Sequence, residues 1–243
     1  MSQVILSKVD LRWNEDVHPH SNLFDDHYYS LVDGLEESRH VFIQGNNLIE
    51  RWQKLAKQQS FSIMETGFGS GLNFLATWQV WNSLKLNKTN KLHYISIEAF
   101  PMNSAQLEKS LANWKSSLSA FTKQLLEKYP PLKSGSHQLL FENDNLVLTL
   151  VFADVRKIMP SYESKSDGLV DAWYLDGFAP SKNPEMWQDN LYTEMYRLSK
   201  QQATVATYTV AGIVRRGLTR AGFSIGRKKG FGTKREMLTA IKK

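Results

Sequence analysis

The sequence contains no cysteine. This absence excludes disulfide bonds, thiolate zinc sites, iron–sulfur clusters, a cysteine nucleophile and any redox-active cysteine pair. The six histidines are scattered along the chain without a frame of carboxylates around them, so no metal site is predicted. The chemistry of the chain is therefore expected to depend on carboxylates, amides, basic groups and aromatic rings.

Long hydrophobic runs are also lacking. The N-terminus has no basic segment followed by an apolar stretch, so a signal peptide is not predicted. An uncharged run at residues 66–84 contains three glycines and several amides, which makes it too polar to span a membrane. We expect a cytoplasmic protein that makes no contact with a membrane.

The composition that is present is that of a globular protein. Of the 243 residues, 42% are hydrophobic and 22% are charged, which excludes a disordered or fibrous chain and provides enough apolar material for a core. The sequence shows no internal repeat and no segment typical of a linker. We expect one structural unit, in which residues 1–60 form an N-terminal extension packed on a core domain of residues 61–243.

The net charge of +6 comes from one part of the chain. Residues 215–235 contain no acid and eight basic residues, which are Arg215, Arg216, Arg220, Arg227, Lys228, Lys229, Lys234 and Arg235. A concentrated basic segment is suited to contacts with nucleic-acid phosphates. The same segment would also suit a solvated face beside acids that the fold brings close, and charge alone does not separate the two interpretations.

Predicted strands and helices alternate along most of the chain. The predicted strands are residues 61–65, 92–98, 137–141, 146–153, 170–176, 203–208, 223–227 and 236–241, and the predicted helices are residues 48–58, 72–84, 102–114, 184–198 and 212–221. This alternation is typical of an α/β fold with a mostly parallel sheet covered by helices on both faces. The last two strands are joined by a short link and pair antiparallel, so one antiparallel C-terminal strand is expected.

Acidic residues stand at the ends of four predicted strands. These residues are Glu65, Glu98, Asp154 and Asp176. In an open α/β sheet the ligand binds beyond the carboxyl ends of the strands, so the four side chains are expected at one site. Each alone is better explained as a solvated loop carboxylate or a helix cap. Together they favour a ligand with ribose hydroxyls, an exocyclic amine and a cationic centre, and they would repel a triphosphate.

A glycine-rich turn follows the first of these strands. It contains Gly67, Gly69 and Gly71 in a G-x-G-x-G pattern. A dinucleotide fingerprint needs a glycine where Leu72 stands, and a P-loop needs Gly-Lys-Ser/Thr after the glycines. Both phosphate-binding turns are therefore disfavoured. The turn, combined with Glu98 after the second strand, resembles the S-adenosylmethionine site of class I methyltransferases.

The segment after the fourth strand carries the candidate chemistry. Asp176 is followed by Phe178 and Pro180, an arrangement that resembles N-methyltransferases in which an oxygen accepts a hydrogen bond from the target amine and an aromatic ring stacks on a flat substrate. The alternative is that Phe178 packs in the core and Gly177 only turns the chain. Methylation of carbon 5 of a pyrimidine usually needs a cysteine nucleophile, so the absence of cysteine points to a nitrogen acceptor.

Motifs along nearly the whole chain resemble one known family, the methyltransferase domain of the bifunctional tRNA 5-methylaminomethyl-2-thiouridine biosynthesis proteins (MnmC). The matching segments are FDDHYYS at residues 24–30, GLEESR at 34–39, ETGFGSGLNF at 65–74, EAFP at 98–101, LDGFAPSKNP at 175–184, VRRG at 214–217 and KGFGTKREML at 229–238. The resemblance implies a class I, Rossmann-like methyltransferase domain over residues 61–243. It also implies methyl transfer from S-adenosylmethionine to the amine of 5-aminomethyl(-2-thio)uridine at the tRNA wobble position.

The resemblance also implies roles for individual residues. The expected cofactor-binding residues are Glu65, Gly67, Phe68, Gly69, Gly71, Glu98, Asp154 and Asp176. The expected catalytic residues are Asp176 and Phe178. The expected substrate-binding residues are Asp25, Tyr28, Pro180, Lys182, Arg215, Arg216, Lys229, Lys234 and Arg235, with the segment at residues 24–30 acting as a lid.

The expected partner is the anticodon stem-loop of tRNA. A fused or separate FAD-dependent oxidoreductase domain is expected to make the aminomethyl precursor, because the bifunctional proteins contain one. Glycine patterns for FAD are absent from these 243 residues, so no FAD is expected in this chain. The alternatives are an N-methyltransferase of another amine or base and a catalytically silent RNA-binding module on the same fold.

Overall fold

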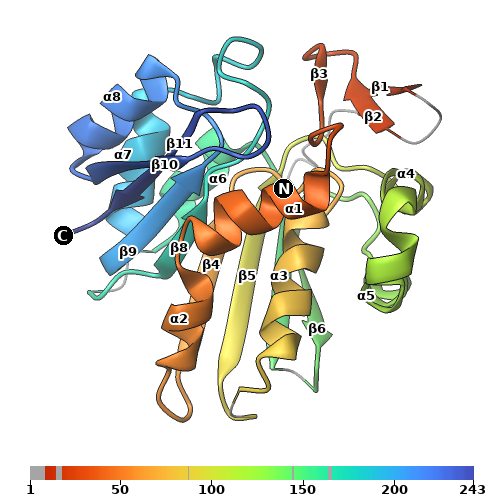
Figure 1. Cartoon of the computed structure of the whole chain (residues 1–243), viewed down its shortest axis with the longest axis horizontal. Helices are drawn as coiled ribbons and strands as arrows, with labels where there is room; N and C mark the ends of the chain where they lie inside the picture. The colour runs from red at the N-terminus through yellow and green to blue at the C-terminus, as the bar shows by residue number, and fades with distance from the viewer. Residues whose placement is uncertain (1–8, 15–17, 87, 144, 164–165) are drawn as a thin grey trace.

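A computed structural model of the chain describes residues 9–14, 18–86, 88–143, 145–163 and 166–243. Its centre is an eight-stranded sheet in the order β10-β11-β9-β8-β4-β5-β7-β6 (Figure 1). The strands are β4 (Ser60–Glu65), β5 (Lys91–Glu98), β6 (Gly135–Phe141), β7 (Leu146–Phe152), β8 (Val170–Tyr174), β9 (Ser199–Thr207), β10 (Ser224–Lys229) and β11 (Glu236–Ile241). The prediction of a mostly parallel α/β sheet is confirmed.

Strand direction follows from the length of the connections. Strands β7, β5, β4, β8 and β9 run parallel to one another, and β11 is antiparallel to β9 and β10. Strand β11 is thus the antiparallel C-terminal strand that the sequence predicts. At the opposite edge β6 is also antiparallel, because only residues 142–145 join it to β7 and so short a turn forms a hairpin.

Helices cover both faces of the sheet (Figure 1). One face packs α3 (Leu72–Ser83), α4 (Ser104–Ser110) and α5 (Lys115–Lys128), together with α1 (Gly34–Ser38), the π-helix η1 (Arg39–Gln44) and α2 (Leu48–Gln53). The other face packs α6 (Val155–Ile158), α7 (Asp189–Leu198) and α8 (Gly212–Ala221). Short 3-10 turns η2 (Ala112–Trp114) and η3 (Met159–Ser161) follow α4 and α6.

Three predicted helices differ from the structure by more than one residue in their bounds. Helix α2 ends at Gln53 and α4 ends at Ser110, both earlier than expected. The predicted helix at residues 184–198 begins only at Asp189, because residues 184–188 form turns and bends beside the candidate site. Helix α5 is not predicted, since its serines and threonine weaken helix propensity and few of its residues are buried.

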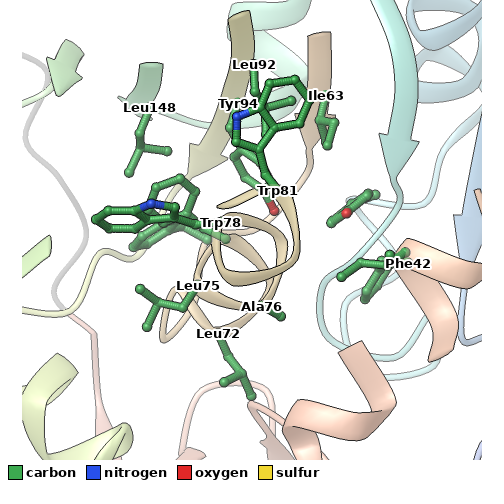
Figure 2. Packing of buried hydrophobic residues seen from close by; sticks show 14 of the residues in the cluster. Phe42, Ile63, Leu72, Leu75, Ala76, Trp78, Trp81, Leu92, Tyr94 and Leu148 are labelled. Carbon is green, nitrogen blue, oxygen red and sulfur yellow. The ribbon is translucent and has the colours of Figure 1, made fainter. Parts of the chain in front are cut away.

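Two tryptophans of α3 lie in the core, as the sequence analysis expects. Trp78 is fully buried and packs against Phe141 with the two rings tilted and their centroids 4.5 Å apart. Trp81 packs edge-on against Trp52 of α2, with ring centroids 5.2 Å apart. In Figure 2 the Trp81 ring lies near Ile63 of β4 and Leu92 of β5, whereas the Trp78 ring lies toward Leu148 of β7. The two rings thus pack α3 onto the sheet.

The N-terminal residues supply a cover for that end of the sheet. A small antiparallel sheet of β1 (Leu11–Asn14), β2 (His18–Ser21) and β3 (Asp26–His27) lies above the carboxyl ends of the strands (Figure 1). The first eight residues of the expected N-terminal extension lie outside the described residues.

Within the described ranges, no helix is both long and apolar enough to cross a membrane.

Candidate active site

A cavity of about 1330 Å³ opens at the carboxyl ends of the central strands. Its wall comes from the turn after β4, the ends of β5 and β7, and the segment after β8, and residues 23–31 close one side. Ten of the predicted site residues line it, namely Tyr28, Gly67, Phe68, Gly69, Glu98, Asp154, Asp176, Phe178, Lys182 and Lys234. Segments that are far apart in the chain therefore meet here.

The other predicted site residues do not line this cavity. Among the described residues, those outside its wall are Glu65, Gly71, Asp25, Pro180, Arg215, Arg216, Lys229 and Arg235. Gly71 instead begins α3 in a left-handed conformation (φ +75°), where a Cβ would stand 2.7 Å from the Phe68 ring. Its glycine identity is thus explained by the tight turn rather than by a direct contact with a ligand.

The glycine turn and Glu98 are joined by hydrogen bonds. The Gly69 amide donates to Glu98 Oε2 at 2.8 Å, and the Phe100 amide donates to Oε1 at 2.7 Å. Burial raises the pKa of Glu98, and the backbone donors oppose this shift. The Phe68 and Ala99 amides also act on this carboxyl group. Both of its oxygens are acceptors, and two neighbouring hydroxyls of a ribose could donate to them.

Asp154 is held by Arg156. It caps α6 by accepting from the Arg156 amide at 2.9 Å, and the Arg156 guanidinium contacts both carboxylate oxygens, with Nη2 2.6 Å from Oδ2. Although burial alone would raise the pKa of Asp154, the hydrogen bonds from Arg156 hold it below its ordinary value. Arg156 also donates to Glu185 at 2.7 Å, so this wall of the cavity carries an ion-pair network.

Asp176 follows β8, and each of its two carboxylate oxygens accepts a hydrogen bond. The Asn73 amide nitrogen donates to Oδ2 at 2.7 Å, and the Gly177 amide donates to Oδ1 at 2.9 Å. Burial raises the pKa of Asp176 to about 6, while the donors Gly177 and Asn73 act in the opposite direction. A carboxyl group with this pKa can accept a proton near neutral pH and release it again.

Phe178 belongs to an aromatic group in the cavity. Phe24 stacks on it with ring centroids 4.6 Å apart, and Tyr28 packs edge-on at 5.0 Å. Phe24 also contacts Phe100 edge-on at 5.3 Å. Because the Trp187 indole donates to the Phe178 carbonyl oxygen at 2.9 Å, the backbone beneath this ring is anchored. The rings form an apolar wall suited to a flat ligand.

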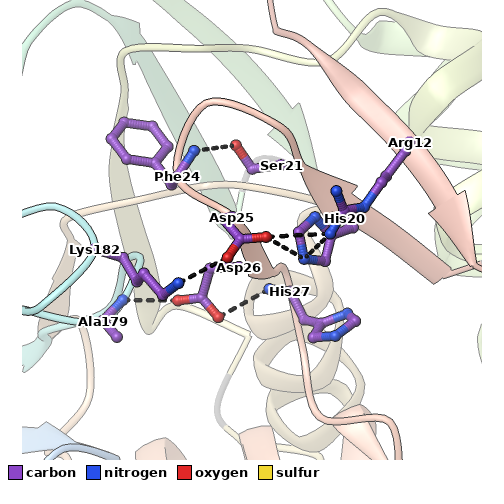
Figure 3. Close-up of polar contacts among 9 residues, drawn as sticks. All are labelled: Arg12, His20, Ser21, Phe24, Asp25, Asp26, His27, Ala179 and Lys182. Carbon is purple, nitrogen blue, oxygen red and sulfur yellow. Dashed lines mark hydrogen bonds and ion pairs between the residues drawn. The ribbon is translucent and has the colours of Figure 1, made fainter.

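The segment above the cavity is tied to the segment after β8 by acidic side chains (Figure 3). Asp26 accepts from the Ala179 amide at 2.9 Å, and Asp25 accepts from Lys182 at 2.8 Å and from Arg12 at 3.1 Å. The Lys182 ammonium holds the pKa of Asp25 below its usual range. Asp25 thus lies at the exposed rim and fastens the cover, whereas Asp26 lines the cavity.

Sequence reasoning did not identify Asn73, Phe24, Asp26 and Tyr208 as site residues. All four line the cavity, and the Tyr208 hydroxyl donates to the Gly177 carbonyl oxygen at 2.9 Å. The one available signal for Asn73 was an amide in the first turn of a helix whose other residues are mostly apolar. For Phe24 and Asp26 the signal was their position in the matched segment at residues 24–30.

Glu65 is fully buried behind the cavity wall. It accepts from Asn73 at 2.9 Å and from the Ser96 hydroxyl at 2.7 Å. Burial, together with the charge of Asp176, raises the pKa of Glu65 from 4.5 to about 8 despite these donors. The folded state therefore holds a proton that the unfolded chain releases at a lower pH.

Glu65→Gln is expected to weaken the pH dependence of stability. Because the folded-state pKa is raised, the free energy of unfolding of the unchanged protein decreases as pH rises from about 4.5 to about 8. Glutamine keeps the side-chain volume and cannot ionise, so Tm of Glu65→Gln is expected to fall less over this range. Thermal unfolding at several pH values measures this, with the exposed Glu108→Gln as control. If Tm of Glu65→Gln and Tm of the unchanged protein changed with pH in parallel, the raised pKa of Glu65 would be contradicted.

The basic segment at residues 215–235 is only partly neutralised. Arg220 pairs with Asp189, Arg227 with Glu236 at 2.8 Å, and Lys234 with Glu37 at 2.7 Å. In the part of the chain that the structure describes, no ion pair is formed by the exposed residues Arg215, Arg216, Lys229 and Arg235. Lys234 extends the segment to the cavity itself. Unpaired positive charge therefore lies on the elements next to the site.

The sheet topology, the glycine turn and the acidic strand ends define a class I, Rossmann-like methyltransferase. The chain belongs to the family described as S-adenosyl-L-methionine-dependent methyltransferase, whose model matches residues 116–243. The cofactor of the chain is therefore S-adenosylmethionine, as the sequence predicts.

Two similar proteins are named tRNA 5-methylaminomethyl-2-thiouridine biosynthesis bifunctional protein MnmC. The one from Vibrio campbellii is 47% identical over 96% of this chain, and the one from Legionella pneumophila (strain Lens) is 45% identical over 95%. The chain spans only 35% and 36% of their lengths. The resemblance to the methyltransferase domain of the MnmC proteins is confirmed by these relatives.

The fold is similar to the crystal structure of MNMC2 from Aquifex aeolicus. The two structures align with a TM-score of 0.72 over 92% of this chain and 66% of that chain. At 21% sequence identity, this likeness concerns the fold alone.

Proposed function

We propose that this chain transfers a methyl group from S-adenosylmethionine to the amine of 5-aminomethyluridine, or its 2-thio form, at the wobble position of tRNA. The product is 5-methylaminomethyl(-2-thio)uridine. The observation that carries the proposal is Asp176, a carboxyl group of raised pKa that lines the same cavity as the Phe178 ring and the glycine turn. The names of the relatives support the nucleoside as the substrate.

The cavity residues fit the cofactor. Glu98 has acceptor capacity for the ribose hydroxyls, and the turn at Gly67 and Gly69 brings backbone without side chains to the cavity wall. Asp154 would accept a hydrogen bond from the adenine amine, beside or in place of one of its contacts with Arg156. When bound, the cofactor supplies an electrophilic methyl group on sulfur.

Asp176 would act on the amine. A primary alkylamine is mostly protonated at neutral pH and has no free lone pair, so it must lose a proton before it attacks the methyl carbon. The ammonium group would donate to the Asp176 carboxylate, and the proton would pass to one of its oxygens. The same contact orients the nitrogen.

The aromatic residues would bind the base. A pyrimidine ring is flat and would lie against Phe178, with Phe24 and Tyr28 around it. Pro180 follows in the same segment, and Lys182 is close enough to Asp25 to fasten the cover during binding. These contacts exclude water from the reacting amine.

The tRNA would be held mainly through its phosphates. We propose that the anticodon stem-loop contacts Arg215, Arg216, Lys229, Lys234 and Arg235, which lie on α8, on β10 and in the turn after β10. The relatives are bifunctional, and this chain spans only 35% of the length of the one from Vibrio campbellii. We propose that an FAD-dependent oxidoreductase domain, fused or separate, supplies the aminomethyl precursor.

Arg215→Glu combined with Arg216→Glu is expected to weaken tRNA binding and to reduce its dependence on salt. Neither arginine has an acidic partner within the described residues, so both are available to phosphates. The slope of log affinity against log salt is expected to fall by about one unit for each phosphate that the variant no longer neutralises. Binding of tRNA at a series of salt concentrations measures this.

The matched control is Lys57→Glu combined with Lys91→Glu. Both lysines are exposed and lie near the amino ends of β4 and β5, away from the cavity, so the same change in net charge is made elsewhere. An equal change of slope in both double variants would mean that only net charge matters. Methylation of a small amine that is insensitive to salt would favour the alternative N-methyltransferase.

A further inference from the structure

Asn73 connects two buried carboxyl groups. Its side-chain nitrogen donates to Glu65 Oε1 at 2.9 Å and to Asp176 Oδ2 at 2.7 Å. Glu65 ends β4, Asp176 follows β8, and Asn73 lies in the first turn of α3, so the contact joins three elements. An amide nitrogen has two hydrogens, and here each has its own carboxyl oxygen.

The contact at the amide oxygen of Asn73 determines which way this side chain is oriented. The Ser38 hydroxyl donates to Asn73 Oδ1. A hydroxyl can donate to that oxygen. If the amide were reversed, its oxygen would face the acceptor oxygens of Glu65 and Asp176, and neither hydrogen bond to them could form. The backbone is also held, because the Thr77 hydroxyl donates to the Asn73 carbonyl oxygen at 2.7 Å. Ser38 on α1 therefore aims the nitrogen of Asn73 at Asp176.

We propose that Asn73 is a positioning residue for methyl transfer, which holds the Asp176 carboxylate in the orientation that receives the substrate amine. The inference rests on the proposed function, in which Asp176 contacts the amine. It adds a residue without contact to the reacting atoms, and it explains why an amide lies between two acids.

The same contact acts on the charge of Asp176. The Asn73 N–H group stabilises the ionised form of Asp176, while burial and the charge of Glu37 favour the protonated form. The charged and titratable groups around Asp176 are Glu65 from β4, Glu37 from α1, Lys234 from the turn after β10, Tyr94 from β5 and Tyr208 after β9. Asn73 is the side-chain donor that favours the ionised form of Asp176, and it acts together with the Gly177 amide.

The test is a pH titration of Asp176 in the full chain without cofactor or tRNA. Carbon-13 NMR of labelled aspartate carboxyl groups follows the titration, and Asp176→Asn identifies the signal. In Asn73→Leu, which has a similar volume and no donor, the midpoint is expected to rise by about one pH unit because a charge-assisted hydrogen bond is removed. The acid limb of kcat is expected to move by the same amount, with S-adenosylmethionine affinity unchanged.

The control is Asn82→Leu, the same substitution at an exposed position near the end of α3, which leaves both carboxyl groups with their donors. Its Asp176 midpoint is expected to stay where it is. A folded Asn73→Leu with an unchanged midpoint would overturn the proposal. If Asn73→Leu does not fold, Ser38→Ala decides: a smaller rise in the midpoint supports the proposal and no rise overturns it.

This titration requires no methyl transfer, so it separates the two proposals. An Asn73-dependent midpoint in a chain that methylates no amine would contradict the proposed function and leave the link between Asn73 and Asp176 intact. An active chain whose midpoint and kcat profile do not respond to Asn73→Leu would contradict only the positioning role.

Discussion

Asp176→Ala is expected to lower kcat by at least about 100-fold, the smaller end of what a positioned acid or base contributes. The variant lacks the carboxylate that would receive the proton of the amine and orient its nitrogen. Affinity for tRNA is expected to remain, because the unpaired basic residues lie outside the cavity wall. Single-turnover kinetics with saturating tRNA and cofactor measures the loss.

The pH profile gives the control for this prediction. Because the carboxylate is the active form and the pKa of Asp176 is about 6, kcat of the unchanged protein is expected to fall as pH drops through about 6. The residual activity of Asp176→Ala is expected to lack this acid limb. Turnover of Asp176→Ala equal to that of the unchanged protein would remove Asp176 from the mechanism.

Glu98→Gln is expected to weaken S-adenosylmethionine binding by about 100-fold. The ionised carboxylate can accept from two ribose hydroxyls, and hydrogen bonds to a charged group contribute about 1.5–3 kcal/mol each. Glutamine keeps one acceptor oxygen, so one of the amides of Gly69 and Phe100 loses its acceptor, and thermal unfolding is measured alongside to show that the variant folds. Calorimetry of cofactor binding measures the effect.

The control for Glu98→Gln is Glu108→Gln, which alters an exposed acid on α4 outside the cavity wall. Its cofactor affinity is expected to be unchanged. If a folded Glu98→Gln bound the cofactor as tightly as the unchanged protein, the ribose contact would have to be assigned to another residue.

The strand-end rule predicted the position of the site along the sheet. It brought Glu98, Asp154 and Asp176 to one cavity, because the carboxyl ends of parallel strands share an edge. The rule could not predict that the Glu65 side chain is fully buried. Successive residues of a strand point to opposite faces, so a side chain at a strand end can enter the cavity or turn into the core. Glu65 does the latter.

The contacts that complete the site could not be derived from local patterns. Asn73 meets Asp176 from 103 residues away, and Asp26 meets the Ala179 amide from 153 residues away. Pairings of this kind depend on the packing of whole elements. Helix α5 was missed for a related reason, since its helical form depends on packing against α3 and α4 more than on its own composition.

Methyl transfer to a defined atom is the central claim, and one incubation tests it most directly. The purified chain is mixed with labelled S-adenosylmethionine and tRNA from cells that lack this methylation, and the nucleosides are analysed by mass spectrometry. We expect 5-aminomethyl(-2-thio)uridine to be converted to its 5-methylamino form, with the label on the side-chain nitrogen. Label on another nucleoside or atom, or measurable cofactor binding without any conversion, would contradict the assignment of this substrate.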